Sequence, residues 1–167
     1  YPNATIELVD VSPESLAVCR ERLGNDSRFR YREDEFRELG DQPDTFDLVV
    51  SSIAFHHLRS MEKQELFDLL YRILRPGGVF AYADQHAGAT AEITARHTRH
   101  WHDASMCAGS SESEWEMWMQ HQRDHEFHDK TTDQMAWLQS AGFVDVDCPW
   151  RYLLWTVLQA RRAVSGK

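Results

Sequence analysis

The segment from residue 46 to residue 84 constrains the fold of this chain more than any other part of its sequence. Residues 48–50 are a short apolar run with branched side chains, which is typical of a strand covered on both faces. Apolar side chains then recur at helical spacing over residues 66–74, and Pro76 with two following glycines predicts a tight turn into a second strand. That strand ends at Asp84. The pattern predicts a parallel βαβ unit with a ligand crevice at its strand ends.

The sequence before this segment shows the same alternation. Residues 5–10 predict a strand, and Ser12 predicts the cap of a helix that continues over residues 13–23. Alternating apolar and basic residues over 28–32 predict an edge strand, followed by an acidic loop. The order β-α-β-loop-β-α-β indicates a doubly wound, mostly parallel α/β sheet.

The last part of the chain predicts an antiparallel hairpin on the edge of this sheet. A capping box at Thr131 starts a helix that Gly142 ends. Residues 143–146 then predict a strand that Pro149 breaks, and residues 152–158 predict a final strand.

Residues 86–130 differ in character from their surroundings. They contain seven of the nine histidines and predict two helices that form a lid over the crevice, within a single domain spanning residues 1–167. His121 and His125 have a spacing that a metal ion could use, but a solvated, partly packed helix face is favoured, and no metal site is predicted. Trp115 and Trp118 are interpreted as a packing stripe.

Length and composition exclude several classes of function. A chain of 167 residues fits one domain, and its formal net charge of −9 argues against a nucleic-acid surface. The three cysteines lack CxxC spacing, which favours a reducing cytoplasm. No apolar run approaches the roughly 20 residues that span a bilayer, so no membrane partner is expected. A small-molecule substrate is favoured, and the oligomeric state stays open.

Acidic residues follow the first two predicted strands. Asp10 ends the first strand directly before the capped helix, where a carboxylate can accept both hydroxyl hydrogens of an adenosine ribose, or can simply lie near a helix N-terminus. Asp34 or Glu35 could contact an adenine amino group, although exposed acids are common in loops. His56 and His57 follow the strand that carries Ser51 and Ser52, so at least one of them could serve as a general base or substrate donor, while helix capping or packing is the alternative.

Taken together, four pieces of the sequence resemble the class I S-adenosylmethionine-dependent methyltransferases. They are IELVDVSPESL, FDLVVSSIAFHHL, the LRPGG turn and the ending LQSAGFVDVDCPWRYLLWTVLQAR. The resemblance implies a Rossmann-like, seven-stranded sheet with an antiparallel C-terminal hairpin. It also implies S-adenosyl-L-methionine as cofactor, with Asp10 on the ribose, Val11 on adenine, Asp34 or Glu35 at the adenine edge, and Ser51 at the methionine end.

The resemblance also shows a departure at the start of the chain. The family's first strand and glycine-rich loop should precede Asp10 by about 20 residues, which places them before Tyr1. We therefore expect this chain to lack both elements.

The resulting expectation is methyl transfer to a small-molecule acceptor. His57 is the candidate catalytic base, with Asp84 or His86 as substitutes. Two alternatives remain. A nicotinamide oxidoreductase would use Asp10 equally well, although the C-terminal hairpin and the absence of a Tyr-x-x-x-Lys dyad argue against it. A non-catalytic binding module without the cofactor loop is the other.

Overall fold

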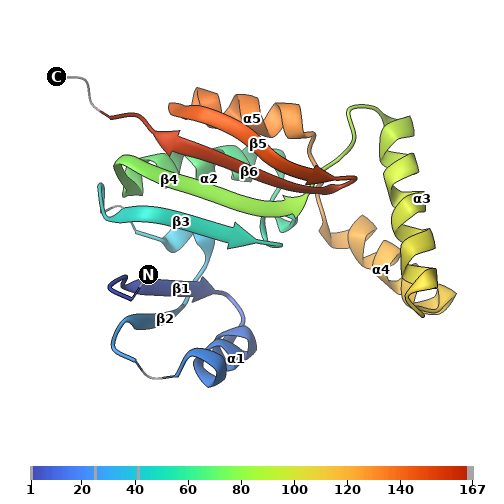
Figure 1. Cartoon of the computed structure of the whole chain (residues 1–167), viewed down its shortest axis with the longest axis horizontal. Coiled ribbons are helices and arrows are strands. Elements are labelled where there is room, and N and C mark those ends of the chain that lie inside the picture. The colour runs from blue at the N-terminus through green and yellow to red at the C-terminus, as the bar shows by residue number, and fades with distance from the viewer. Residues whose placement is uncertain (1, 25, 41, 165–167) are drawn as a thin grey trace. The chain divides into compact units, whose positions relative to one another are not determined.

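The computed structural model describes residues 2–24, 26–40 and 42–164. The chain divides into two compact units, one up to residue 41 and one from residue 42 onward, and each is described by itself. Helices and strands alternate as far as β4, three successive helices follow, and an antiparallel hairpin, β5 and β6, comes last (Figure 1). The predicted α/β class and the predicted hairpin are confirmed.

In the first unit, two parallel strands flank a helix, as the sequence predicts. The Ser12 side chain accepts the N–H of Ser15 at 3.1 Å and so caps the helix, and Gly24 ends it with a φ of +75°. Neighbouring residues in the sequence are enough to predict where this helix begins and ends, because both caps bond backbone groups of the same helix. Its elements are β1 (Ile6–Asp10), α1 (Pro13–Leu23), β2 (Phe29–Glu33) and a 3₁₀ turn (Phe36–Glu38).

The second unit is built on a four-stranded sheet with the order β3-β4-β6-β5. β3 and β4 are parallel, whereas β6 runs antiparallel to both of its neighbours. Its elements are β3 (Phe46–Ser52), a 3₁₀ turn (Phe55–His57), α2 (Ser60–Ile73), β4 (Leu74–Gln85), α3 (Ala91–Cys107), α4 (Glu112–His125), α5 (Thr131–Ser140), β5 (Phe143–Tyr152) and β6 (Trp155–Arg162).

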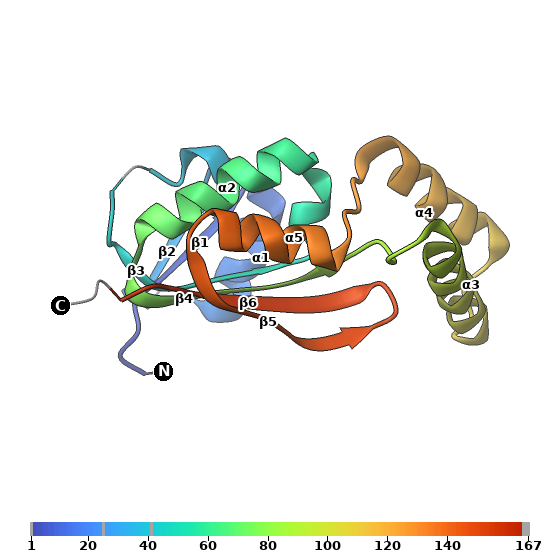
Figure 2. The same cartoon turned by 90° about the horizontal axis from the view of Figure 1, so that it is seen from above.

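The core of the second unit lies between this sheet and the helices α2 and α5, which lie on the same side of it (Figure 2). Its centre is aromatic: the rings of Phe80 and Tyr82 stack with centroids 5.2 Å apart, and Phe55 lies 5.1 Å from Tyr82. Leu48 and Val50 point to the other face and are 51% and 68% exposed. The prediction that this strand is covered on both faces is therefore wrong, because both helices pack on one side.

Two places where the sequence predicts that a strand begins after a turn or ends lie inside strands of the structure. The predicted Pro-Gly-Gly turn is the irregular beginning of β4, where the register with β3 shifts and Gly77 has a φ of +83°. A side chain at Gly78 would place a Cβ 2.8 Å from the carbonyl oxygen of Arg75, so the strand needs glycine there. Likewise, β5 continues through Pro149. β5 is an edge strand with irregular register, where a missing N–H is tolerated.

The predicted capping box at Thr131 is also absent. Lys130 is the N-cap of α5 and makes no side-chain cap. The Thr131 hydroxyl instead lies 3.1 Å from Nδ1 of His86 and accepts a hydrogen bond from Arg151 at 2.8 Å. Gln134 accepts the Tyr82 hydroxyl at 2.6 Å. Thr131 and Gln134 therefore make tertiary hydrogen bonds and do not cap the helix.

The two helices predicted within residues 86–130 are present. α3 begins at its cap Thr90, and α4 begins with a capping box between Ser111 and Glu114. Both lie beyond the carboxyl ends of β3 and β4 (Figure 1). In the described ranges no helix is long and apolar enough to cross a membrane.

Candidate functional site

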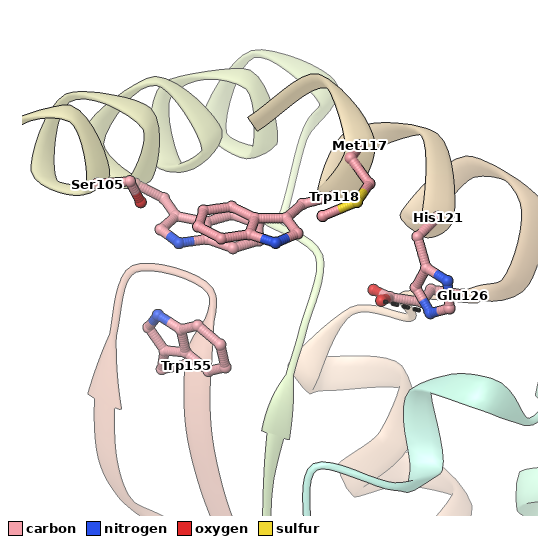
Figure 3. A pocket seen from close by; sticks show the side chains of 7 residues that line it. Ser105, Met117, Trp118, His121, Glu126 and Trp155 are labelled. Carbon is pink, nitrogen blue, oxygen red and sulfur yellow. Dashed lines mark ion pairs between the residues drawn. The ribbon is translucent and has the colours of Figure 1, made fainter. Parts of the chain in front are cut away.

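A pocket of about 610 Å³ opens between the helices α3 and α4 and the start of β6. Three indole rings line it: Trp101 from α3, Trp118 from α4 and Trp155 from β6. Figure 3 labels the last two of them. Trp101 and Trp118 are parallel within 2°, with ring centroids 6.4 Å apart, and Trp155 lies at 77° to Trp101 at 6.0 Å. A pocket of this size and apolar character suits a small organic ligand.

Polar groups gather at the other side of this pocket. Besides Ser105 of α3, the polar lining includes His121 near the end of α4 and Glu126 just after it, and Nε2 of His121 lies 3.9 Å from Oε1 of Glu126. The Glu126 side chain is only 10% exposed. Nε2 of His128 donates to its second oxygen at 2.9 Å. Burial holds the pKa of His128 below its ordinary value, against the pull of Glu126, so this donor is the neutral imidazole.

The segment that carries Glu126 is held by hydrogen bonds to α2 and to the turn at His56. The buried ammonium of Lys63 on α2 donates to the carbonyl oxygen of Phe127 at 2.5 Å and to the carboxylate of Asp129 at 2.6 Å. The N–H of Phe127 donates to the carbonyl oxygen of His56 at 2.6 Å. Because a buried ion pair is costly to break, this segment is held in one position.

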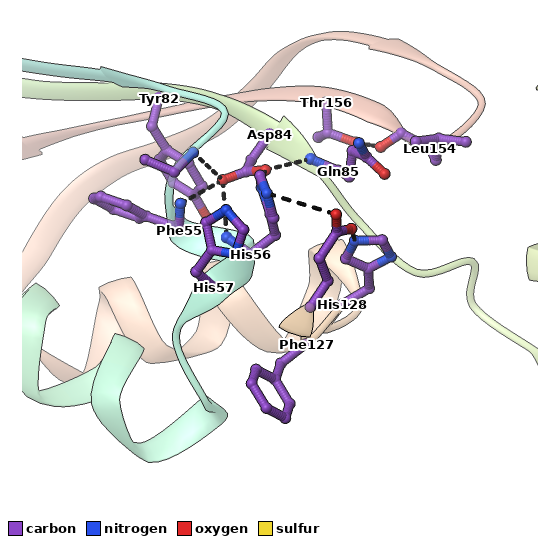
Figure 4. Close-up of polar contacts among 12 residues, drawn as sticks. Phe55, His56, His57, Tyr82, Asp84, Gln85, Phe127, His128, Leu154 and Thr156 are labelled. Carbon is purple, nitrogen blue, oxygen red and sulfur yellow. Dashed lines mark hydrogen bonds and ion pairs between the residues drawn. The ribbon is translucent and has the colours of Figure 1, made fainter. Parts of the chain in front are cut away.

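His56 connects the pocket side to the end of the sheet. It is 4% exposed, and its Nδ1 lies 2.6 Å from Oδ1 of Asp84 (Figure 4). Since a carboxylate accepts, Nδ1 carries the proton. Nε2 faces Glu126 at 4.0 Å. The imidazole of His56 therefore lies between two carboxylates.

Asp84, at the end of β4, receives five hydrogen bonds. Oδ2 accepts the backbone N–H groups of Ala54, Phe55 and His56 at 3.3, 2.7 and 3.1 Å, and Oδ1 accepts the N–H of Gln85 at 2.7 Å besides the His56 ring. Burial raises the pKa of Asp84, but the hydrogen bond and charge of His56 and the backbone donors outweigh it, so the pKa lies below its ordinary value. Such a carboxylate organises the site rather than accepting a proton.

His57 is exposed and lies next to this network. Its Nδ1 lies 3.3 Å from the carbonyl oxygen of His125, which can only accept, so the proton is on Nδ1 and the lone pair is on Nε2. Its ring centroid is 4.1 Å from His56 and 6.1 Å from His121, which lines the pocket. This geometry leaves a basic nitrogen beside the pocket.

The structure places the other second-unit candidates around the same strand ends. Ser51 is half-buried near the end of β3 and pairs with Tyr82 of β4. His86 is 1% exposed, burial lowers its pKa to about 4, and its Nε2 has no hydrogen-bond partner within the described residues. In those residues, no group of three or more His, Cys, Asp or Glu side chains is arranged to hold a metal ion.

In the first unit, the predicted residues lie together at the ends of its two strands. Asp10 pairs with the last residue of β2, its Oδ1 accepts the N–H of Ser12 at 2.9 Å, and the following Val11 is 64% exposed. The Asp34 carboxylate is bound by Arg32 at 2.6 Å, and hydrogen bonds from Glu38 and Arg32 hold its pKa below the ordinary value. Glu35 is exposed.

Five of the residues that line the pocket had no functional interpretation in the sequence: Trp101, Ser105, Met117, Glu126 and Trp155. Glu126 is one acid among many, and Trp155 stands inside a strand-forming stretch. Only contacts with residues distant in the sequence place these five residues at one site. Trp118, expected to belong to a packing stripe, contacts other indoles and also lines the pocket.

The chain is similar to known proteins in sequence and in fold. Residues 1–78 match the methyltransferase domain family. An uncharacterized methyltransferase of Anoxybacillus flavithermus is 30% identical over 82 residues, which cover 49% of this chain and 37% of the relative. The chain spans little more than a third of the first curated relatives that it matches, at 37%, 36% and 38% of their lengths.

Solved structures share the fold. An S-adenosylmethionine-dependent methyltransferase from Mesorhizobium loti superposes with a TM-score of 0.64 at 20% identity, covering 95% of this chain and 81% of that one. Human N-acetylserotonin methyltransferase, solved in complex with SAM, gives a TM-score of 0.63 at 17% identity and covers 98% and 42%. The fold is therefore the Rossmann-like fold of class I S-adenosylmethionine-dependent methyltransferases.

His86 makes the stability of the protein depend on pH. Below pH 6.5 the unfolded chain binds a proton at this residue, whereas the folded chain does not until about pH 4. The stability due to neutral burial is thus complete above pH 6.5 and is lost as the pH falls toward 4. We expect this residue to lower the free energy of unfolding by about 2 kcal/mol between pH 7 and pH 5.

Urea denaturation at both pH values checks this, with His86→Gln compared to the wild type and His100→Gln as a control on an exposed position of α3. His86→Gln should lose about that much of the difference between the two pH values, and His100→Gln should keep it. Equal pH differences in all three proteins would contradict the assignment.

Proposed function

We propose that this chain, whose residues 1–78 match the methyltransferase domain family and whose fold is that of class I S-adenosylmethionine-dependent methyltransferases, transfers the methyl group of S-adenosyl-L-methionine to a small organic acceptor in the pocket between Trp101, Trp118 and Trp155. One observation carries the proposal. The pocket lies beside His57, whose lone-pair nitrogen faces away from its backbone partner, at the carboxyl ends of β3 and β4. Ligands bind at this edge of α/β sheets. The net charge of −9 and the three free cysteines favour a small-molecule partner and a cytoplasmic location.

The residues of the first unit fit the nucleoside part of such a cofactor. Asp10 uses one oxygen for the N–H of Ser12, and in the described residues no hydrogen bond occupies the other, which suits a ribose hydroxyl. Val11 offers an exposed apolar surface to adenine. For the adenine amino group we favour Glu35 over Asp34, because Arg32 already binds the Asp34 carboxylate. In the second unit, Ser51 is proposed to contact the methionine end.

Bound S-adenosylmethionine supplies a methyl group on a positively charged sulfur, which a lone pair of the acceptor displaces in line. The protein then has two tasks: to align the acceptor and to remove its proton where it has one. The indole rings hold the acceptor. Nε2 of His57 takes the proton, while Asp84 and His56 fix the turn that carries His57.

Calorimetry with S-adenosylhomocysteine tests the cofactor, using the whole gene product that carries this chain. We expect binding, and we expect Asp10→Ala to weaken it by about tenfold to a hundredfold, because hydrogen bonds to a charged group contribute about 1.5–3 kcal/mol. Glu33→Ala, at the paired position of β2, is the matched control and should bind as the wild type does.

The same titrations separate the rival functions. Binding of NAD without binding of S-adenosylhomocysteine would favour the oxidoreductase. If neither ligand binds at concentrations well above micromolar, the chain is a non-catalytic module and the proposal is refuted.

His57 is tested by methyl transfer from isotopically labelled S-adenosylmethionine to a panel of amines, phenols and thiols. For any acceptor that loses a proton, His57→Gln should lower kcat by about 10²-fold or more. It should also abolish the rise of the rate with pH that a general base causes, and it should leave the affinity for S-adenosylhomocysteine unchanged. His100→Gln is the control. A wild-type rate in His57→Gln would exclude His57 as the base.

A further inference from the structure

The three indoles of the pocket form the walls of an aromatic box. Trp101 and Trp118 present parallel rings, and Trp155 stands nearly perpendicular to Trp101. Each of the three side chains is half-buried rather than enclosed in the core. Apolar rings left accessible at one place, around a pocket of about 610 Å³, mark a binding site rather than a packing cluster.

A carboxylate is the acidic group of the pocket. Among the residues that the structure describes, no lysine or arginine lines the pocket, and Glu126 provides a carboxylate that is nine-tenths buried. The nearest partner of this carboxylate is His128, which burial keeps neutral and which therefore does not compensate the negative charge. An anionic ligand would meet Glu126 at short range, whereas a cation would be attracted by both the carboxylate and the ring faces.

We propose that this pocket binds an organic cation, an ammonium group of the methyl acceptor, against the faces of Trp101, Trp118 and Trp155 with Glu126 as its counter-ion. That the bound cation is the methyl acceptor rests on the proposed methyltransferase function, whereas the binding of the cation does not. Recognition of ammonium groups by aromatic rings is strongest with indole and increases when the cation is desolvated. Met117 adds an apolar contact at the same pocket.

Methyl transfer to an amine acceptor requires a base, and His57 is the residue proposed for it. An ammonium has no lone pair, so one N–H bond must break first, and the proton goes to Nε2 of His57, which lies next to His121 of the pocket. The freed lone pair forms the N–C bond to the transferred methyl group, and the C–S bond breaks with its electron pair kept by sulfur. The product is again an ammonium and keeps its positive charge.

The test compares choline with 3,3-dimethylbutan-1-ol, which has the same shape without the charge. Neither is a methyl acceptor at its central atom, so binding is measured alone, by tryptophan fluorescence and by calorimetry. We expect choline to bind at least tenfold more tightly, since a cation–π contact together with a carboxylate exceeds the interaction energy of about 1.4 kcal/mol that tenfold represents. Equal affinities, or no choline binding, would overturn the proposal.

Variants assign the binding to the named groups. Glu126→Gln should weaken choline by about fivefold or more and leave the alcohol unchanged, while Trp118→Leu should weaken choline and reduce the fluorescence change. Trp150→Phe, 52% exposed and outside the pocket lining, is the control for both readouts. Unfolding midpoints within a few degrees of the wild type show that the variants are folded. Unchanged choline affinity in both pocket variants would also overturn the proposal.

Titration of S-adenosylhomocysteine in the same samples separates this inference from the proposed function. If S-adenosylhomocysteine binds and choline shows no preference over the alcohol, the cation pocket is refuted while methyl transfer stands. If choline is preferred and S-adenosylhomocysteine does not bind, the cation pocket stands and the methyltransferase proposal is refuted.

Discussion

The second unit depends on the carboxylate of Asp84 more than on any other polar group. Asp84 is the last but one residue of β4 and is buried, where an uncompensated charge would be very costly, and five hydrogen bonds from described residues stabilise its carboxylate. Three of them come from consecutive backbone N–H groups, so the carboxylate fixes the 3₁₀ turn Phe55–His57 as well. The position of His57, at the end of that turn, follows from this constraint.

The same constraint extends to the pocket. The turn holds the segment after α4 through the bond from the Phe127 N–H to the His56 carbonyl, and Lys63 holds that segment from α2. Glu126 is therefore fixed relative to His56, and α3, α4 and the start of β6 place the indoles in the same pocket. A buried polar network costs stability unless each of its polar atoms has a hydrogen-bond partner. Among the described residues, two buried side-chain atoms have no such partner: Nε2 of His86 and Nδ1 of His97.

Local features of the fold could be predicted from the sequence, whereas the site could not. The helix start at Ser12, the βαβ order and the C-terminal hairpin depend on neighbouring residues, and all three are present. The contact between His56 and Asp84 joins residues 28 positions apart, so nothing in the sequence distinguishes His56 from His57. The pocket combines three separate elements, and the strand through Pro149 depends on being at the sheet edge. Such features follow from tertiary neighbours, which a single sequence does not specify.

The protonation of His56 tests the central claim, that Asp84 organises the site, most directly. Long-range ¹H–¹⁵N NMR of the imidazole side chains, with His56 assigned by comparison with His56→Gln, reports which ring nitrogen carries the proton. The structure predicts a protonated Nδ1 with a strongly downfield proton, as expected for a short charge-assisted bond of 2.6 Å to Asp84. An unprotonated Nδ1 at neutral pH, with the proton on Nε2, would contradict the account.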